Sequence, residues 1–377
     1  MKFIFHVSPN MKGKQTTQHI MRDLTIALLA VFACSVIYYG TAFGWNVAGH
    51  EILLLVCALV TAFICEFLFA KITKQDWKPF IQNSFGWVTA IILTMMCTVN
   101  VTAYAIIIAT IFAIVVGRLL FGGFGQNIFN PAAVGRAVIF AAFTGASTDL
   151  ITSATPITNM ATSFNWLPGS QAMVNAFVND YGGWTGLLLG THAGAIGETF
   201  ILAILIAGAF LIWRKVIDWR TPVVYFATIA ILTAVIALLC GLEPYNGIPA
   251  FLWYPALHLL TGGVVFGGVF MLTDPVTNPV SPAGRVLFAL GCGILTVLIR
   301  LKANLPEGCL YSILLMNMFT PMIEQSFDGK QLEVLKKARI VTAIVAIIGL
   351  ASCFYISSTE QPVYMRNDAY HVTEEAD

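Results

Sequence analysis

The sequence predicts an all-α polytopic membrane protein, and three observations support this fold class. Hydrophobic residues make up 58% of the chain and charged residues only 10%, whereas soluble domains average about 25% charged residues. Mean hydropathy is +0.81, and many apolar runs approach the roughly 20 residues that a helix needs to cross a bilayer. Lys and Arg gather in alternate connections between these runs. We therefore expect many helices to cross a bilayer in succession.

The first half, residues 24–145, follows a basic head at residues 1–23 and contains five predicted helices. Two long apolar runs come first, and the second ends at a lysine-rich stretch. A short run, a longer run after a brief polar link, and a short helix opened by an Asn-Pro pair follow. The five segments are residues 24–43, 52–70, 87–97, 102–120 and 132–143. We expect the short ones to be broken, tilted or buried in the bundle, because they cannot span a bilayer alone.

The second half, residues 196–323, follows an outer loop at residues 146–195 and also contains five predicted helices. The first two flank a basic stretch, and Gly- and Pro-containing turns separate the others. The five segments are residues 198–213, 223–242, 251–272, 286–299 and 311–323. A basic linker at 324–339 then leads to an extra C-terminal transmembrane helix at about 340–356 and an acidic tail.

The distribution of positive charge predicts the orientation. With alternating crossings, nearly all Lys and Arg residues fall on one face, which we assign to the cytoplasm. The opposite connections, at residues 44–51, 99–101, 144–195 and 243–250, contain none. Arg300 and Lys302 are exceptions at the predicted outer end of a helix. The loop after residue 144 is thus predicted to face outward.

Some classes of site and partner receive no support from composition. The net charge of +1 gives no reason to expect a nucleic-acid partner. The eight cysteines include no C-x-x-C pair, so we expect no disulfide framework and no metal or iron–sulfur site from this chain alone.

A faint internal repeat is also present. Asn130-Pro131 is followed by Gly135-Arg136, and Asn278-Pro279 is followed by Gly284-Arg285, each after a glycine-rich run. One interpretation is chance similarity between two Gly/Pro-rich turns. The other is a duplicated five-helix unit whose interrupted segments meet near the membrane midplane, where transporters place their binding sites.

The outer loop contains the heptad Asp149-Leu150-Ile151-Thr152-Ser153-Ala154-Thr155. On chemistry alone this hydroxyl-rich stretch could be an ordinary loop. It resembles, however, the flavinylation motif D-x-x-[ST]-x-A-[TS], at which a dedicated transferase esterifies the last Thr with the phosphate of FMN. The flanking segments resemble, in the same order, those of the RnfD/NqrB family of flavin-carrying membrane subunits. These segments are Gly122 to Pro131, Gly197 to Thr199, Met271 to Val276 and Pro306 to Gly308.

The resemblance extends from about residue 8 to residue 325 and implies a covalent FMN on Thr155. Asp149 and Thr152 fill the other defining positions of the motif and are expected to be read by the flavin transferase. Ser153 stands where relatives often have Gly. A tether through the phosphate leaves the isoalloxazine ring intact for redox chemistry.

Asn127 and Asn130 lie on a Gly-rich turn before a helix and have two interpretations. They can cap the helix that starts at Pro131 and stabilise the turn. They can also bind the ring edge of a second, noncovalent flavin, since in NqrB-like relatives the matching asparagines lie at a riboflavin. Such a site would lie near the cytoplasmic face, so that electrons could cross the membrane between two flavins.

Four acidic residues are candidates for an ion path, because a charge at bilayer depth is costly and usually functional. They are Glu66, Glu198, Asp274 and Glu307. Glu198 and Glu307 could instead be carboxylates at helix N-termini, and Asp274 a turn residue. Glu66 could snorkel or pair with Lys71. The sequence does not choose between Na⁺ and H⁺.

The resemblance favours the D subunit of an Rnf-type complex, which couples electron flow between ferredoxin and NAD⁺ to Na⁺ or H⁺ translocation. It implies an inner-membrane location. The expected partners are the other subunits, including a periplasm-facing flavoprotein subunit, the flavin transferase and membrane lipid. The B subunit of a Na⁺-translocating NADH:quinone reductase is an alternative within the family. A non-redox channel or solute carrier is an alternative from another class, for which the heptad would have no use.

Overall fold

The computed structural model describes residues 16–143, 155–190, 192, 194–303, 308–329 and 331–364. Within these ranges the chain is helical, and its only β-structure consists of isolated bridges. Six helices are long and apolar enough to cross a membrane, or seven if one bent pair is counted as a single span. The predicted fold class, an all-α polytopic membrane protein, is therefore confirmed.

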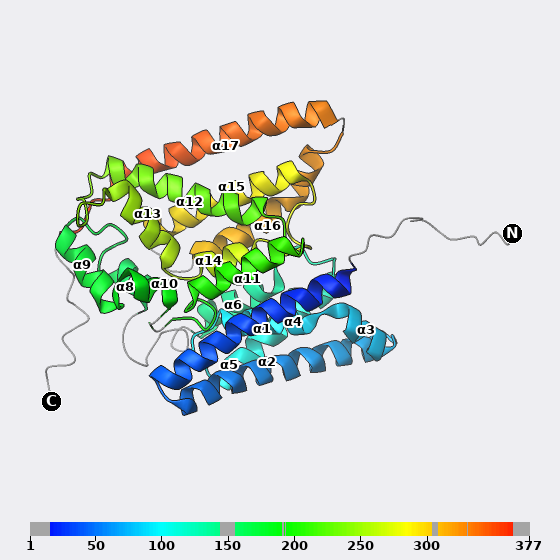
Figure 1. Ribbon diagram of the computed structural model, residues 1–377. Coiled ribbons are helices and arrows are strands. Elements are labelled where there is room, and N and C mark those ends of the chain that lie inside the picture. The colour runs from blue at the N-terminus through cyan, green and yellow to red at the C-terminus, as the bar shows by residue number, and fades with distance from the viewer. Residues whose placement is uncertain are drawn as a thin grey trace.

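The first half forms the lower part of the bundle in Figure 1. The long helices α1 and α2 are an antiparallel pair, and α2 packs on α4 and α5. Helix α5 continues into a π-helical segment, η1, and a short 3₁₀ turn, η2, precedes the Gly-rich loop. The bounds are α1 (Thr17–Ala42), α2 (Trp45–Ile72), α3 (Trp77–Ser84), α4 (Gly86–Met95), α5 (Ala103–Ile111), η1 (Phe112–Val116), η2 (Leu119–Phe121) and α6 (Pro131–Ala142).

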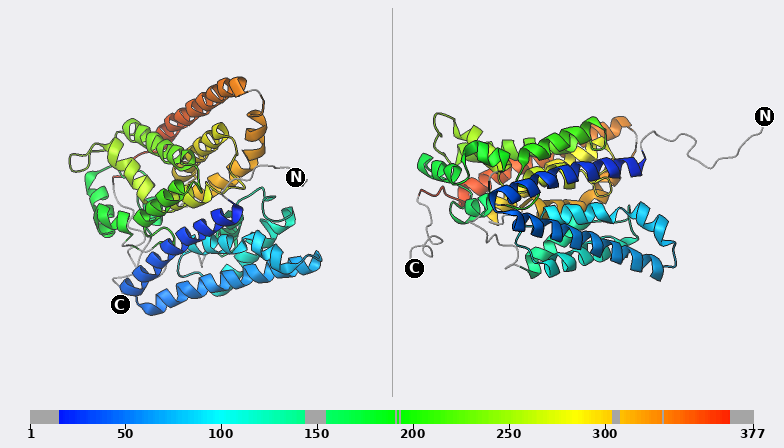
Figure 2. Two further views of the ribbon diagram at one scale, coloured as in Figure 1. Left: turned by 45° about the vertical axis from the view of Figure 1, so that its right-hand side comes forward. Right: turned by 60° about the horizontal axis from the view of Figure 1, so that its bottom comes forward.

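The second half packs against the first through α1 and α11 and through α6 and α16. Helix α17 lies along the outside of α12 and α15, at the top of Figure 1 and at the edge of the bundle in the left view of Figure 2. The bounds are α11 (Ile201–Trp213), α12 (Arg220–Leu239), α13 (Ala250–Leu260), α14 (Val264–Phe266), π-helical η3 (Gly267–Met271), α15 (Pro282–Lys302), α16 (Gly308–Ser326) and α17 (Gln331–Thr359).

All eleven predicted segments are helical, although α1, α2 and α17 begin seven to nine residues before the predicted bounds, and two further segments differ. Helix α11 begins at Ile201, not at residue 198. The segment predicted at 251–272 is broken, because α13 and the α14–η3 unit meet at a bend of 75°. Gly262 at this bend has φ = +70°, a left-handed conformation that glycine adopts without strain.

The outer loop contains three short helices that the sequence analysis did not predict. They are α8 (Pro156–Thr162), α9 (Gln171–Asp180) and α10 (Gly183–Leu189). Their connections bury large apolar side chains, including Phe164 and Trp166, both 0% exposed. The apolar residues of this loop thus form a small packed layer over one end of the bundle.

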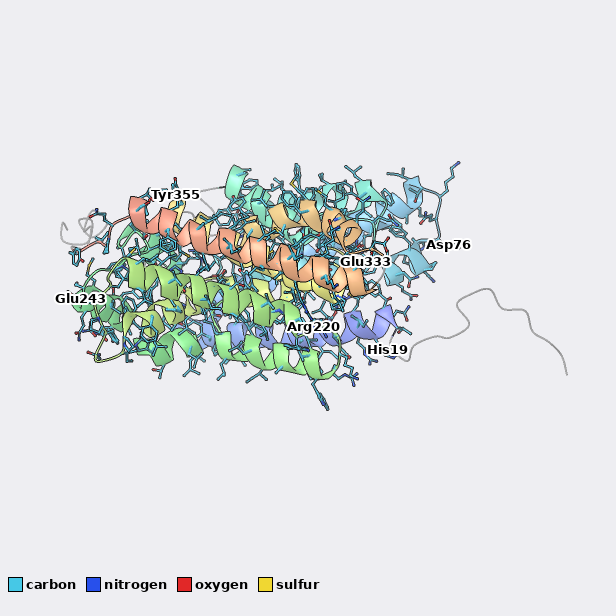
Figure 3. All side chains as sticks on the ribbon, turned by 90° about the horizontal axis from the view of Figure 1, so that it is seen from above. His19, Asp76, Arg220, Glu243, Glu333 and Tyr355 are labelled. Carbon is cyan, nitrogen blue, oxygen red and sulfur yellow. The ribbon has the colours of Figure 1, made fainter. Side chains whose placement is uncertain are left out.

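The two ends of the bundle agree with the alternating topology. In Figure 3, His19, Arg220, Glu333 and Asp76 lie toward one end, and Glu243 and Tyr355 lie toward the other. Helices α8 to α10 occupy the end at which α1 finishes (Figure 1). The ends can therefore be named by the predicted orientation, inner for the first group and outer for the second.

The two copies of the sequence repeat share a local structure. Each follows a π-helical segment, η1 or η3, and each leads into a helix with Pro in its first turn, α6 or α15. π-Helical turns are rare and often occur at functional sites. The five-helix duplication itself stays a prediction.

Candidate functional site

A pocket lies at the inner end, between the two halves of the bundle. Its cavity volume is about 50 Å³, smaller than the roughly 300–1,000 Å³ of pockets that hold a small molecule. Apolar side chains predominate in its wall, with a few polar groups among them. The polar lining residues are Thr89, Arg118, Asn127, Asn130, Thr273 and Asp274.

Asn127 and Asn130 line this pocket together. The Asn130 side-chain oxygen accepts hydrogen bonds from the backbone N–H groups of Ala132 (3.0 Å) and Ala133 (3.4 Å), so it caps α6. Its amide donates to the carbonyl of Met271 at the end of η3 (3.4 Å). Asn130 therefore caps a helix and joins the two halves.

The Asn127 side chain makes fewer hydrogen bonds within the protein than that of Asn130. Its amide nitrogen donates to the carbonyl of Phe129 (3.0 Å), which fixes the Gly-rich turn. Its side-chain oxygen accepts no hydrogen bond identified within the described chain, and that atom is not among the fully buried ones. Asn127 is thus the better placed of the two to offer polar atoms to a ligand.

Glu66 and Arg118 form a buried charged pair beside the pocket. Both side chains are 2% exposed, and their closest charged atoms are 3.7 Å apart. The Ser84 hydroxyl donates to Glu66 (2.5 Å) and accepts from Arg118 (2.9 Å). A hydroxyl thus bridges the acid and the base, and the partner of Glu66 is Arg118 and not Lys71.

The same carboxylate stabilises the start of α4. Residue Phe85 at the N-cap has φ = +56° and supplies no capping hydrogen bond. Glu66, from α2, interacts with the Gly86 backbone instead, and a β-carbon at position 86 would collide with its carboxylate. A carboxylate is favoured at a helix N-terminus, where N–H groups are free.

Asp274 is a turn residue at the edge of the pocket. It accepts hydrogen bonds from the Thr277 hydroxyl (3.1 Å) and the Val276 N–H (3.5 Å). Burial raises the pKa of the Asp274 carboxyl, and these hydrogen bonds and the charge of Arg118 partly offset the increase. The structural interpretation of Asp274 is thus supported, and the residue also faces the candidate ligand site.

Glu198 does not open α11, which corrects the sequence expectation. It lies three residues before the helix, in a turn in which its N–H donates to the Ala195 carbonyl (2.9 Å). Its carboxyl lies against Gly263, where α14 begins, so that a β-carbon at 263 would come within 2.5 Å of it. Glu198 therefore contacts the far side of the break between α13 and α14.

Arg300 occupies the near side of the same break. Its guanidinium donates to the carbonyls of His258 (2.8 Å) and Thr261 (2.9 Å), at the end of α13. The residue is 1% exposed. The helix dipole stabilises a cation at a helix C-terminus and an anion at a helix N-terminus. Arg300 departs from the clustering of positive charge on the inner face because it donates to the carbonyls of a broken helix inside the protein.

The connection between α4 and α5, at residues 96–102, is another interruption of the bundle and is closed by backbone atoms. The N–H groups of Ile196 and Gly197 donate to the carbonyls of Cys97 (2.9 Å) and Met95 (2.6 Å). The Tyr39 hydroxyl fixes the donor segment by bonding to the Gly194 carbonyl (2.9 Å). The segment before α11 thus contacts the α4–α5 connection through its backbone and the break between α13 and α14 through Glu198.

Thr155 is the N-cap of α8 at the outer end. Its hydroxyl accepts from the Thr158 N–H (3.2 Å) and lies 2.8 Å from the Thr158 hydroxyl. The residue is only 7% exposed, although it lies in the loop predicted to face outward. In the first turn of α8, Pro156 has no N–H and the N–H groups of Thr158 and Asn159 already bond to Thr155, which leaves that of Ile157 for a phosphate. Asp149, Thr152 and Glu307 lie outside the described residues.

Two buried polar residues were missed by sequence reasoning. Glu51, in the second turn of α2, is 0% exposed. The Ser35 hydroxyl faces it, but neither group has a partner in standard hydrogen-bond geometry within the described chain. His258 is also 0% exposed and stacks on Trp166, with ring centres 5.4 Å apart. Glu51 was placed in a connection, whereas α2 already begins at Trp45.

The architecture defines a class of protein: a multi-pass membrane bundle with a helix broken between α13 and α14, a pocket at one end and a candidate attachment residue at the other. A family model described as NQR2, RnfD, RnfE matches residues 4–333, and the chain belongs to this family. The match ends in the first turn of α17, so most of that helix lies beyond it.

Relatives with curated names are similar over most of their length. The chain is 34% identical to the D subunit of the Na(+)-translocating ferredoxin:NAD(+) oxidoreductase complex of Acetobacterium woodii, over 84% of this chain and 91% of that protein. It is 33% identical to the D subunit of the proton-translocating ferredoxin:NAD(+) oxidoreductase complex of Clostridium ljungdahlii, over 86% and 94%. It is 31% identical to the D subunit of the ion-translocating oxidoreductase complex of Actinobacillus succinogenes, over 84% and 94%.

Proposed function

We propose that this chain is the D subunit of an Rnf-type complex in the inner membrane, which couples electron transfer between ferredoxin and NAD⁺ to ion translocation. The observation that carries the proposal is similarity along nearly the whole length of two relatives named as the D subunit of such complexes. One relative is named for Na⁺ and the other for protons, at almost equal identity, so similarity does not choose the ion. These names favour this assignment over a quinone-reductase B subunit. Family membership also argues against a channel without redox function.

We further propose that Thr155 carries FMN through a phosphoester at its hydroxyl oxygen. The motif match supports the residue, and its hydroxyl lies at the N-terminal end of α8. Bound FMN would supply one- and two-electron redox chemistry at a fixed position. Because the Thr155 side chain is buried, it must turn away from Thr158 before the flavin transferase can reach it. Its electrons would come from a periplasm-facing flavoprotein subunit.

The inner pocket is proposed to open and hold the second, noncovalent flavin, riboflavin. The pocket combines apolar walls with polar atoms of Asn127, Arg118 and Asp274, which suits a planar ring with a polar edge. Of the proposed ion-path acids, Glu66 and Asp274 lie at this pocket or beside it, and Glu198 lies at the break of α13. Glu307 is the fourth proposed acid of the ion path, and the proposal for it rests on the sequence. Electron transfer and ion movement would then share the interface between the halves.

The decisive experiment is production of the full chain together with a flavin transferase, followed by a denaturing gel viewed under ultraviolet light. The wild-type band should fluoresce, and mass spectrometry should locate FMN on Thr155. Thr155→Val should abolish the fluorescence, while Thr158→Val, which removes the neighbouring hydroxyl, should keep it. A dark wild-type band, or FMN on another hydroxyl, would refute the attachment proposal.

The coupling ion can be identified with the whole complex in sealed vesicles. Electron flow from reduced ferredoxin to NAD⁺ should drive uptake of the coupling ion. If Na⁺ is the primary ion, a protonophore leaves its uptake intact, whereas a primary proton pump loses all ion uptake. No ion movement during rapid electron flow would contradict the proposed function.

A further inference from the structure

The residues that follow α17 return to the outer loop. Glu360 accepts a hydrogen bond from Lys302 in the last turn of α15, with Lys302 Nζ 2.7 Å from Glu360 Oε1. Its other carboxylate oxygen accepts from the Asn165 amide (3.4 Å). One side chain at the end of α17 thus connects α15 with the connection between α8 and α9.

Backbone pairing extends this contact by several residues. The Val363 N–H donates to the Leu167 carbonyl (2.9 Å), and the Gly169 N–H donates to the Val363 carbonyl (2.8 Å). Residues Pro168 and Val363 form a parallel β-bridge. Gly169 packs so closely on Pro362 and Tyr364 that a β-carbon there would lie 2.9–3.0 Å from them. The fit is therefore specific in both backbone and side chains.

The segment held in this way, residues 165–169, connects directly to the helix that Thr155 caps. The Trp166 N–H donates to the carbonyl of Met160 in α8 (2.8 Å). On its other side, the Tyr254 hydroxyl of α13 donates to the Trp166 carbonyl (2.9 Å). Any movement of residues 165–169 would therefore move α8 relative to α13.

We propose that residues 360–364 form a strap that fixes the Thr155-bearing layer on the outer end of the bundle, with Glu360 as its charged anchor. The strap follows a helix that lies almost wholly beyond the family match, so it is an addition to the shared family architecture. It also explains Lys302, the second exception to the charge rule, as the partner of Glu360. The consequence for the flavin rests on the proposed attachment at Thr155.

Two substitutions at one position separate the backbone contact from the side chain. Val363→Pro removes the N–H that bonds to Leu167, whereas Val363→Ala keeps it. Hydrogen–deuterium exchange of the full chain should show amides of residues 165–169 exchanging about fivefold faster in Val363→Pro, the factor that corresponds to about 1 kcal/mol for the one lost bond. Val363→Ala should match the wild type. Equal exchange in the two variants would overturn the strap, whether or not flavin is attached.

The link to the flavin has its own readout. Fluorescence anisotropy of FMN on Thr155 should fall in Val363→Pro and stay constant in Val363→Ala, because a loosened layer lets the ring move. Glu360→Gln, which keeps the shape but removes the charge, should give a smaller decrease, and it serves as the test if Val363→Pro does not fold. If amide exchange is faster but the anisotropy is unchanged in Val363→Pro and Glu360→Gln, the strap holds only the loop, and its role for the flavin is refuted. Absence of covalent FMN in the wild type would refute the attachment proposal without touching the exchange result.

Discussion

The bundle has two interruptions that are closed by different chemistry: the connection between α4 and α5, called the first break below, and the bend between α13 and α14, called the second break. Between α4 and α5, backbone N–H groups of residues 196 and 197 satisfy carbonyls at the end of α4. Between α13 and α14, the Arg300 guanidinium satisfies the carbonyls, and the Glu198 carboxyl lies at the start of the next helix. In the first half the charges lie elsewhere, at the inner start of α4, where Glu66 and Arg118 pair.

This difference has a consequence for function and for mutation. A backbone closure depends little on side-chain identity, because every residue except Pro carries an N–H and every residue a C=O. A closure by a buried charge depends on one side chain and on its counter-charges. The second break is therefore the one that removal of a single side chain can open, and it lies beside the layer that carries Thr155.

The largest effect is expected from Arg300→Met. This change retains an apolar chain of similar length but leaves the carbonyls of His258 and Thr261 without donors, at about 1–3 kcal/mol each. At the first break, Thr98→Val should be nearly neutral, since the buried Thr98 hydroxyl has no hydrogen-bond partner in the described chain. Thermal unfolding in detergent measures both. Equal midpoints for the two variants would show that the breaks do not differ.

A second comparison uses a methyl group at each break. At Gly197 the new β-carbon would lie 2.9 Å from the Met95 carbonyl oxygen, which is backbone and cannot move freely. At Gly263 it would meet the Glu198 carboxyl, the far end of a flexible side chain. We expect Gly197→Ala to cost about 2–3 kcal/mol, within the range of overpacked sites, and Gly263→Ala about 1 kcal/mol. Chemical unfolding of both variants measures the two losses of stability. A larger loss in Gly263→Ala would contradict the view that the backbone at Gly197 cannot move to make room.

The sequence predicted the helices well because their cause is local. A run of apolar residues with charge at its ends specifies a membrane helix without reference to the rest of the chain. The cap that Asn130 forms on α6 followed from an asparagine directly before Pro131, which is also a local signal. Composition could not show the partners of Glu66 and Arg300, because Arg118 and the end of α13 lie 52 and 39 residues or more away. The helices of the outer loop were missed because their apolar residues gain burial only by packing on the bundle.

The inner ends allow a smaller test of ligand binding against capping. Asn130→Ala removes the cap of α6 and the bond to Met271, and should cost about 1–2 kcal/mol of stability. Asn127→Ala should cost less than about 1 kcal/mol, yet lower the content of noncovalent flavin more than Asn130→Ser, which keeps a cap. Flavin extracted from the purified variants and their unfolding curves supply the two measurements. Full flavin content in Asn127→Ala would leave this residue with only a turn role.

The smallest effect on stability is expected at Glu51. Its neighbour His50 lies at the first break, with a ring nitrogen 3.2 Å from the Val101 carbonyl. Glu51 differs from Glu198 at the second break in that its buried oxygens have no hydrogen-bond partner in the part of the chain described. Glu51→Gln keeps the shape and removes no such contact, so stability should change by less than about 0.5 kcal/mol. His50→Phe, by contrast, should lose about 1 kcal/mol with its bond to the break. Marked destabilisation by Glu51→Gln would mean that the carboxylate holds a cation or another charged group, and would place an ionic contact at the first break after all.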